Sequence, residues 1–169
     1  RLDPSLPPEE VLAGLEDVVS SGKVRHVGAS TMRPTQFARI VTLAKRSGIV
    51  RFVAMQNLHN LLYREEERDM NPFCVEEGIS TIPYSPLARG MLSGARLDTS
   101  NPSERARNDG LADYYKREDA RNRPIIEQVV SIAAARGVKP SHVALAWLLS
   151  KPAVAAPVIG ATRHEHIVD

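Results

Sequence analysis

The chain has 169 residues, of which 43% are hydrophobic and 25% are charged, and its formal net charge is only +2. This length suits one domain with a real core, and the small charge gives no reason to expect a nucleic-acid or membrane partner. The one cysteine, Cys74, excludes an internal disulfide and a cysteine-rich metal site, which fits a reducing compartment. We therefore expect a cytoplasmic protein.

The two ends of the sequence do not read as the ends of a protein. Residues 1–4 are neither an initiator nor a targeting segment. The final residues, 167–169, fall within a predicted helix. We therefore expect the sequence to be an excerpt of a longer protein.

Helix and strand patterns alternate over the first 82 residues. Apolar residues recur at helical spacing between a proline-containing start and a glycine stop, for example from Pro34 to Gly48. Short β-branched runs lie between the helices and read as strands. In chain order we predict a helix over 7–22, a strand over 24–30, a helix over 34–48, a strand over 52–57, a charged turn over 64–69, a helix that contains Phe73 and ends at Gly78, and a strand over 79–82.

The pattern changes over residues 91–123, which contain a polar, turn-rich stretch at 101–110. We expect a long loop here, and loops of this size are usually functional or disordered. An apolar helix is predicted to begin at Pro124. A second helix from about Ser141 is apolar nearly all round, so we expect it to be buried. A strand over 153–159 and a last helix follow.

The spacing of the strands predicts the fold class. Strands start near Val24, Phe52 and Ile79, at intervals of 28 (24 to 52) and 27 (52 to 79) residues. Regular alternation of strands and helices predicts an α/β fold with parallel strands, and the near-constant interval favours a (β/α)8 TIM barrel. Only four β/α units are present, so we expect residues 1–169 to form half of a barrel, with the other half on the amino-terminal side.

Three of the predicted strands end in a pair of polar residues at the carboxyl end of the strand. In a barrel these strand ends converge on one mouth. A serine hydroxyl and a glutamine amide suit a carboxamide group of a ligand. The face of a tyrosine suits the aromatic ring that bears this carboxamide. The alternative is that small and amide residues simply end strands. The three pairs are Ser30-Thr31, Gln56-Asn57 and Tyr84-Ser85.

Two further segments suit phosphate groups. Residues 79–90 end in a loop with free backbone amides over 87–90 and the positive charge of Arg89, although an ordinary strand end and turn fits the same residues. Residues 160–162 join a strand to a helix amino terminus, which attracts phosphate in many α/β proteins. Near the second strand end, His59 could border a substrate pocket, but we favour a position outside such a pocket. No pair of histidines has metal-ligand spacing.

The order and spacing of these motifs resemble the aldo-keto reductases, and in particular bacterial members related to voltage-gated potassium-channel β subunits. The likeness extends over essentially the whole chain. Its motifs are Gly28-Ala29-Ser30, Gln56-Asn57, Tyr84-Ser85-Pro86-Leu87-Ala88-Arg89-Gly90 and Pro157-Val158-Ile159-Gly160-Ala161-Thr162.

The resemblance implies the carboxyl-terminal half of a TIM barrel, roughly strands five to eight, with NADP(H) extended across the mouth. Ser30 and Gln56 would hold the nicotinamide carboxamide, and Tyr84 would stack on the ring. The loop over 91–123 would cover the cofactor through Arg105. The other cofactor contacts implied are Ser85, Pro86, Leu87, Ala88, Arg89 and Gly90 at the pyrophosphate, Gly160, Thr162, His166 and Asp169 at the adenosine end, and Arg163 at the 2′-phosphate.

The implied activity is the NADP(H)-dependent reduction of small aldehydes and ketones to alcohols. The catalytic tetrad of this family would lie upstream of Arg1, so no catalytic residue is assigned here. Thr31 and His166 depart from the residues that many members carry. A low-turnover NADP(H)-binding regulatory subunit of the channel-β type is the alternative function. The oligomeric state and the physiological substrate stay open.

Overall fold

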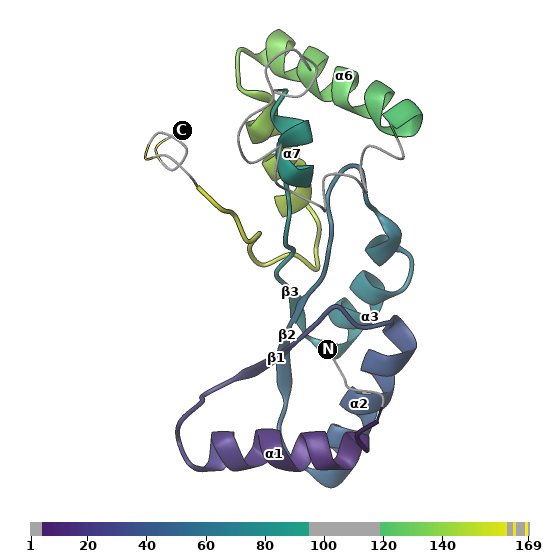
Figure 1. The fold of residues 1–169 in the computed structure, drawn as a ribbon, viewed down its shortest axis with the longest axis vertical. Helices are drawn as coiled ribbons and strands as arrows, with labels where there is room; N and C mark the ends of the chain where they lie inside the picture. Colours follow the sequence, from purple (N-terminus) through teal and green to yellow (C-terminus); the bar gives the residue numbers. More distant parts are fainter. Residues whose placement is uncertain (1–4, 95–118, 162–163, 165–167, 169) are drawn as a thin grey trace.

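The computed structural model describes residues 5–94, 119–161, 164 and 168, and these form an elongated molecule with α1 at one end and α6 at the other (Figure 1). Helices and strands alternate as predicted over the first 82 residues. The elements are α1 (Pro8–Ser20), β1 (Val27–Ser30), α2 (Pro34–Ser47), β2 (Phe52–Gln56), the 3-10 helix η1 (Glu65–Glu67), α3 (Met70–Glu77), β3 (Ser80–Thr81), the 3-10 helix η2 (Ala88–Ser93), α6 (Asp119–Arg136) and α7 (Pro140–Leu149).

The three strands form one parallel sheet in the order β1-β2-β3. The predicted α/β fold with parallel strands is therefore confirmed for this part of the chain, whereas the half-barrel stays a prediction. β3 is short because Pro83 has no N–H with which to continue the ladder.

The predicted strand over 153–159 is present only as isolated bridges beside β3. The Thr81 amide donates to the Ala153 carbonyl at 2.7 Å, and Val158 pairs in parallel with Tyr84. Proline interrupts both sides of this pairing, at 83 and at 157. Because each proline removes a donor, regular strand geometry does not develop. The segment nevertheless runs alongside β3 in the predicted direction.

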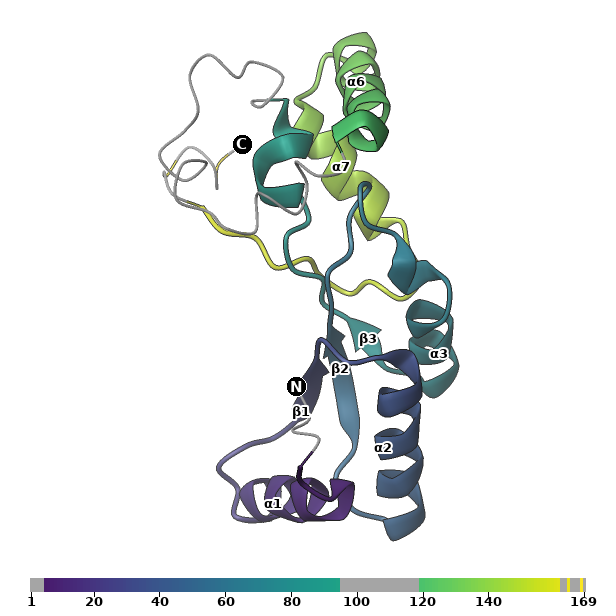
Figure 2. The same ribbon diagram turned by 45° about the vertical axis from the view of Figure 1, so that its right-hand side comes forward.

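The larger hydrophobic core lies between the sheet and α1, α2 and α3, and Figure 2 shows α2 and α3 on the same side of the sheet. Helix α2 begins at Pro34 and ends at Gly48, whose φ of 65° suits a glycine. Its side chains at helical spacing form the buried face of the helix. The ring of Phe37 meets those of Phe52 and Phe73 edge-on, with centroids 5.7 and 5.8 Å apart.

A second, smaller core joins η2 to α6 and α7 at the other end of the molecule (Figure 1). Helix α7 is only partly buried, which corrects the expectation of a buried helix. Ala144 and Leu148 are buried on one side, while Leu149 is 52% exposed. Among the described residues, η2, α6 and the turn after β2 cover parts of this helix, and Leu149 stays accessible.

Helix α6 starts earlier than predicted. It begins at Asp119 rather than at Pro124, so residues 119–123 of the predicted 91–123 loop are helical, as are residues 91–93 of η2. Pro124 lies in the second turn, where it removes one hydrogen bond without ending the helix. Residues 95–118 lie outside the described part. No helix in the described ranges combines the length and apolarity that a membrane crossing needs.

Replacing Phe37 with alanine tests the larger core. The ring is fully buried between two other rings, so Phe37→Ala should lower the free energy of unfolding by about 3–5 kcal/mol. Urea denaturation followed by circular dichroism measures this. The control is Val75→Ala on α3, where the side chain is 53% exposed and the change should stay within about 0.5 kcal/mol. Similar losses in both variants would contradict this description of the core.

Candidate functional site

The carboxyl ends of the strands meet at one edge of the sheet. Ser30 lies opposite Gln56 in the parallel register, and Tyr84 pairs with Leu58 just beyond β2. The Tyr84 amide donates to the Asn57 carbonyl at 3.0 Å. Three residues that the sequence placed at strand ends, Ser30, Gln56 and Tyr84, therefore lie on neighbouring segments of one edge.

The Ser30 hydroxyl is oriented by its neighbours. Its Oγ donates to the Gln56 carbonyl at 3.0 Å, and the Thr31 Oγ1 lies 3.1 Å from the Ser30 Oγ. With its proton directed to Gln56, the Ser30 oxygen can act as an acceptor for an N–H group of a ligand. The half-buried Gln56 side chain offers both a donor and an acceptor beside it.

The loop after Tyr84 has an unusual backbone. Ser85, Ala88 and Arg89 have positive φ values of 52°, 48° and 59°, which side chains disfavour, and Gly90 has a φ of 91°. Strain of this kind gathers at ligand-binding sites. Ser85, Arg89 and Gly90 are half-buried at the loop surface, whereas Pro86 and Ala88 are buried beneath it.

The predicted free amides over 87–90 are only partly present. The Ala88 amide donates to the Ser85 carbonyl, and the Gly90 amide donates to the Leu87 carbonyl, each at 2.9 Å. These two donors are used by the left-handed turns of the loop itself, and this corrects the expectation from sequence. Leu87 packs against the smaller core, so its side chain anchors the loop.

The remaining predicted site residues, apart from Arg105, belong to the last segment of the chain. Gly160 is exposed two residues beyond Val158, whose amide donates to the Pro83 carbonyl at 2.7 Å. This bond keeps the segment beside the Tyr84 strand end. Arg105, Thr162, Arg163, His166 and Asp169 lie outside the described residues, so their roles stay predictions.

A buried polar network beneath the strand ends was missed by sequence reasoning. Asn57 and Asn60 are 4% and 0% exposed. The Asn57 Oδ1 accepts from the Thr31 amide at 3.0 Å, and the Asn60 Nδ2 donates to the Ser85 carbonyl at 2.9 Å. The available signal was the pair of asparagines, Asn57 and Asn60, three residues apart just after β2.

His59 lies between these asparagines in the sequence, but its own contacts are different ones, and it does not border an open pocket. It is 1% exposed, its Nε2 lies 3.1 Å from Glu67 Oε1, and its ring meets Trp147 edge-on. Burial lowers the pKa of His59, and the hydrogen bond to Glu67 opposes this shift. The histidine therefore packs the turn after β2 against α7, which speaks against the substrate-pocket alternative.

Glu67 is the charge that joins this turn to the end of α7. Its carboxylate binds Arg64 at 2.5 Å and lies 3.4 Å from the Lys151 Nζ. The Lys151 ammonium also lies 4.3 Å from the centre of the Trp147 ring. Although burial raises the pKa of Glu67, hydrogen bonds from Arg64 and His59 outweigh burial and hold it at about 2.

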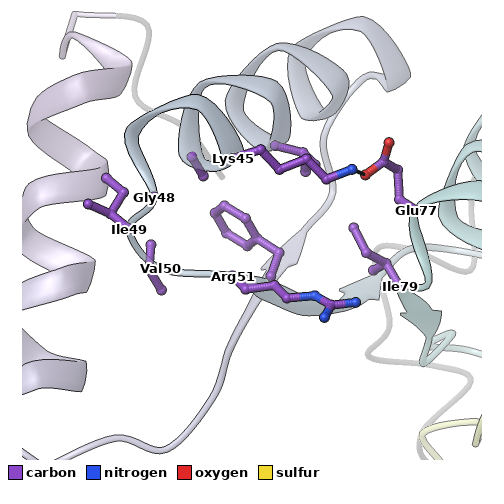
Figure 3. A pocket seen from close by; sticks show the side chains of 10 residues that line it. Lys45, Gly48, Ile49, Val50, Arg51, Glu77 and Ile79 are labelled. Carbon is purple, nitrogen blue, oxygen red and sulfur yellow. Dashed lines mark ion pairs between the residues drawn. The ribbon is translucent and has the colours of Figure 1, made fainter.

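A cavity at the other end of the sheet is not the candidate site. It measures about 220 Å³ and lies near the amino ends of β2 and β3, between apolar residues and the Lys45–Glu77 ion pair (Figure 3). Parallel α/β proteins place ligands at the carboxyl ends of their strands. We therefore assign the candidate site to the edge that carries Ser30, Gln56 and Tyr84.

Removing the Glu67 charge should change the response to acid. The folded-state pKa of about 2 lies below the usual 4.5, so this carboxylate stabilises the fold above pH 4.5 and loses that effect as the pH falls towards 2. The contribution is on the order of 1–2 kcal/mol, because solvent at the exposed Arg64 screens the pair. Urea unfolding at pH 5 and pH 3 should show a smaller difference for Glu67→Gln than for the unchanged protein. The exposed Glu76→Gln is the control, and an equal acid response in all three proteins would contradict this role.

Comparison with known proteins identifies the family. Residues 1–169 match the Aldo/keto reductase family. The chain is 41% identical over 169 residues to versiconal hemiacetal acetate reductase of Aspergillus parasiticus, with 99% of this chain and 48% of that protein covered. It is 42% identical over 160 residues to the aldo-keto reductase dtxS3 of Metarhizium robertsii, with 95% and 42% covered.

A third relative, the aldo-keto reductase AMT2 of Alternaria alternata, is 42% identical over 167 residues, with 99% of this chain and 44% of that protein covered. The chain thus spans about half the length of the curated relatives it matches. These three relatives are fungal, and the narrower likeness to bacterial proteins related to channel β subunits stays a prediction. The match over every residue shows that this chain belongs to the aldo/keto reductase family.

Proposed function

We propose that the complete protein is an NADP(H)-dependent oxidoreductase that reduces small aldehydes and ketones to alcohols. Residues 1–169 would form the carboxyl-terminal half of its (β/α)8 barrel and supply most of the cofactor site. Family membership and the relatives named as reductases support this activity. The observation that carries the proposal is the parallel register, which gathers Ser30, Gln56 and Tyr84 at one edge.

The chemistry of this edge fits a nicotinamide. A carboxamide needs one acceptor for its N–H and one donor for its oxygen, and the Ser30 Oγ and the Gln56 amide offer both. Tyr84 is half-buried, so part of its side chain is accessible for stacking. Together these groups would fix which face of the nicotinamide is covered and which is left for the substrate.

The loop over 85–90 fits the charged middle of the cofactor. Its left-handed residues turn the backbone sharply next to the Tyr84 strand end, and Arg89 adds a cation at the same place. Backbone that turns in this way makes concave sites for anions. In the proposed complex, Arg105 would cover the cofactor, while Gly160, Thr162, His166 and Asp169 would hold the adenosine end and Arg163 the 2′-phosphate.

When bound, NADPH would supply the hydride for carbonyl reduction. The residues of this chain would bind and orient the nicotinamide, and the proton donor would come from the tetrad predicted before Arg1. A tyrosine acting as a general acid is expected there. None of the tyrosines of this chain takes that role in the proposal.

The alternative is a subunit that binds NADP(H) but turns over little. Both functions require the same cofactor site, so binding alone does not separate them. Steady-state turnover of the complete protein with aromatic and aliphatic aldehydes does. A rate near the uncatalysed reaction, with NADPH bound, would favour the regulatory function.

The Tyr84 side chain is the most direct test of the proposed site. On the complete protein, Tyr84→Ala should weaken NADPH binding about tenfold, because stacking contributes roughly 0.5–1.5 kcal/mol beyond simple burial. Titration followed by cofactor fluorescence measures the affinity. Tyr84→Phe keeps the ring and should bind as the unchanged protein does. Unchanged affinity and turnover in Tyr84→Ala would refute the proposed site.

A further inference from the structure

We propose that Asn57 is a positioning residue, which holds Thr31 in a left-handed conformation and thereby orients the Ser30 hydroxyl. This inference rests on the proposed function, because Ser30 is the residue that would bind the nicotinamide carboxamide. Asn57 itself is 4% exposed and touches all three strand ends through its side chain and backbone. Its role would be to shape the site without contacting the cofactor.

Thr31 is the strained residue in this arrangement. Its φ is 51°, a value that a β-branched side chain rarely adopts. The neighbouring structure must therefore hold it there. Its amide donates to two acceptors, the Gln56 carbonyl and the Asn57 Oδ1, each at 3.0 Å. The side chain of Asn57 thus supplies one of the two acceptors of the Thr31 amide.

The conformation of Thr31 affects the orientation of the Ser30 hydroxyl. The Thr31 Oγ1 and the Ser30 Oγ are 3.1 Å apart, and the Ser30 hydroxyl donates to the same Gln56 carbonyl that accepts from the Thr31 amide. If Thr31 relaxed to a negative φ, both contacts would change. The acceptor offered to a carboxamide would then point elsewhere.

An asparagine suits this position better than other small polar residues. Its oxygen accepts from Thr31, and its Nδ2 donates to Glu66 Oε2 at 2.5 Å. A serine is too short to reach both partners, and an aspartate would face the Glu66 carboxylate. The opposed donor and acceptor of a carboxamide match this pair of neighbours.

A second asparagine repeats the arrangement at the neighbouring strand end. The Asn60 Oδ1 accepts from the amides of Leu62 and Tyr63, and its Nδ2 donates to the carbonyl of Ser85, another residue with positive φ. Ser85 follows Tyr84 just as Thr31 follows Ser30. In both places a buried asparagine side chain forms a hydrogen bond with the left-handed residue that follows a proposed cofactor contact.

The test compares two ligands on the complete protein. NADPH contains the nicotinamide, whereas 2′-phospho-ADP-ribose lacks it and keeps the adenosine end. Asn57→Ala should weaken NADPH binding about tenfold, the effect of one lost buried hydrogen bond, and leave 2′-phospho-ADP-ribose binding within about twofold. The matched control is Asn71→Ala. This asparagine is also buried but contacts His59, so NADPH binding should stay unchanged.

A second experiment repeats the NADPH titration in a Thr31→Gly background. A glycine reaches positive φ without the side-chain penalty, so Asn57→Ala should cost less affinity in the Thr31→Gly background, about threefold rather than tenfold. Equal losses in both backgrounds would overturn the proposed route through Thr31. Equal weakening of both ligands by Asn57→Ala would show a general structural role and overturn the inference as well.

If Asn57→Ala does not fold, Glu66→Ala tests the same contact from its other side. Glu66 is half-buried, and its carboxylate accepts the hydrogen bond from the Asn57 Nδ2. Glu66→Ala should weaken NADPH binding about threefold and leave the binding of 2′-phospho-ADP-ribose unchanged. No change in either affinity would overturn the inference. Failure of the unchanged protein to bind NADPH would instead refute the proposed function, so the two failures are distinct.

Discussion

The candidate site depends on the parallel pairing of β1 with β2, which puts Ser30 opposite Gln56. Because parallel strands end at the same edge of a sheet, this pairing converts a spacing of 26 residues along the chain into one hydrogen bond of 3.0 Å. Tyr84 joins the same edge through the Asn57 carbonyl. Without this register, the three polar residues would lie at separate strand ends and would not form one candidate site.

Several non-glycine residues with a strained, left-handed backbone lie at this edge. Thr31, Ser85, Ala88 and Arg89, all with positive φ, lie within a few residues of a proposed cofactor contact. The strain is offset by buried hydrogen bonds, since Asn57 and Asn60 each bond to one of these residues. The arrangement is typical of preorganised binding sites, where an unfavourable backbone is held by the structure around it.

The charged cluster around Glu67 connects the turn after β2 to the end of α7. His59 and Arg64 come from the turn after β2, and Lys151 follows α7, yet all three contact one carboxylate. Trp147 from α7 packs against the same side chains. The turn that supports the strand-end asparagines is therefore fastened to the smaller core, which also contains Leu87 from the loop after Tyr84.

The sequence by itself determined the helices α1 and α2, the parallel α/β order and the three polar strand ends, because prolines, glycines and apolar periodicity act locally. It did not show that α6 begins before Pro124, because a proline in the second turn costs only one bond. Tertiary structure alone decided the burial of His59, the use of two loop amides within the 85–90 turn and the contact between Asn57 and Thr31. Each of these depends on groups that are brought together by folding, and no local pattern in the chain records which partner a buried amide or imidazole will meet.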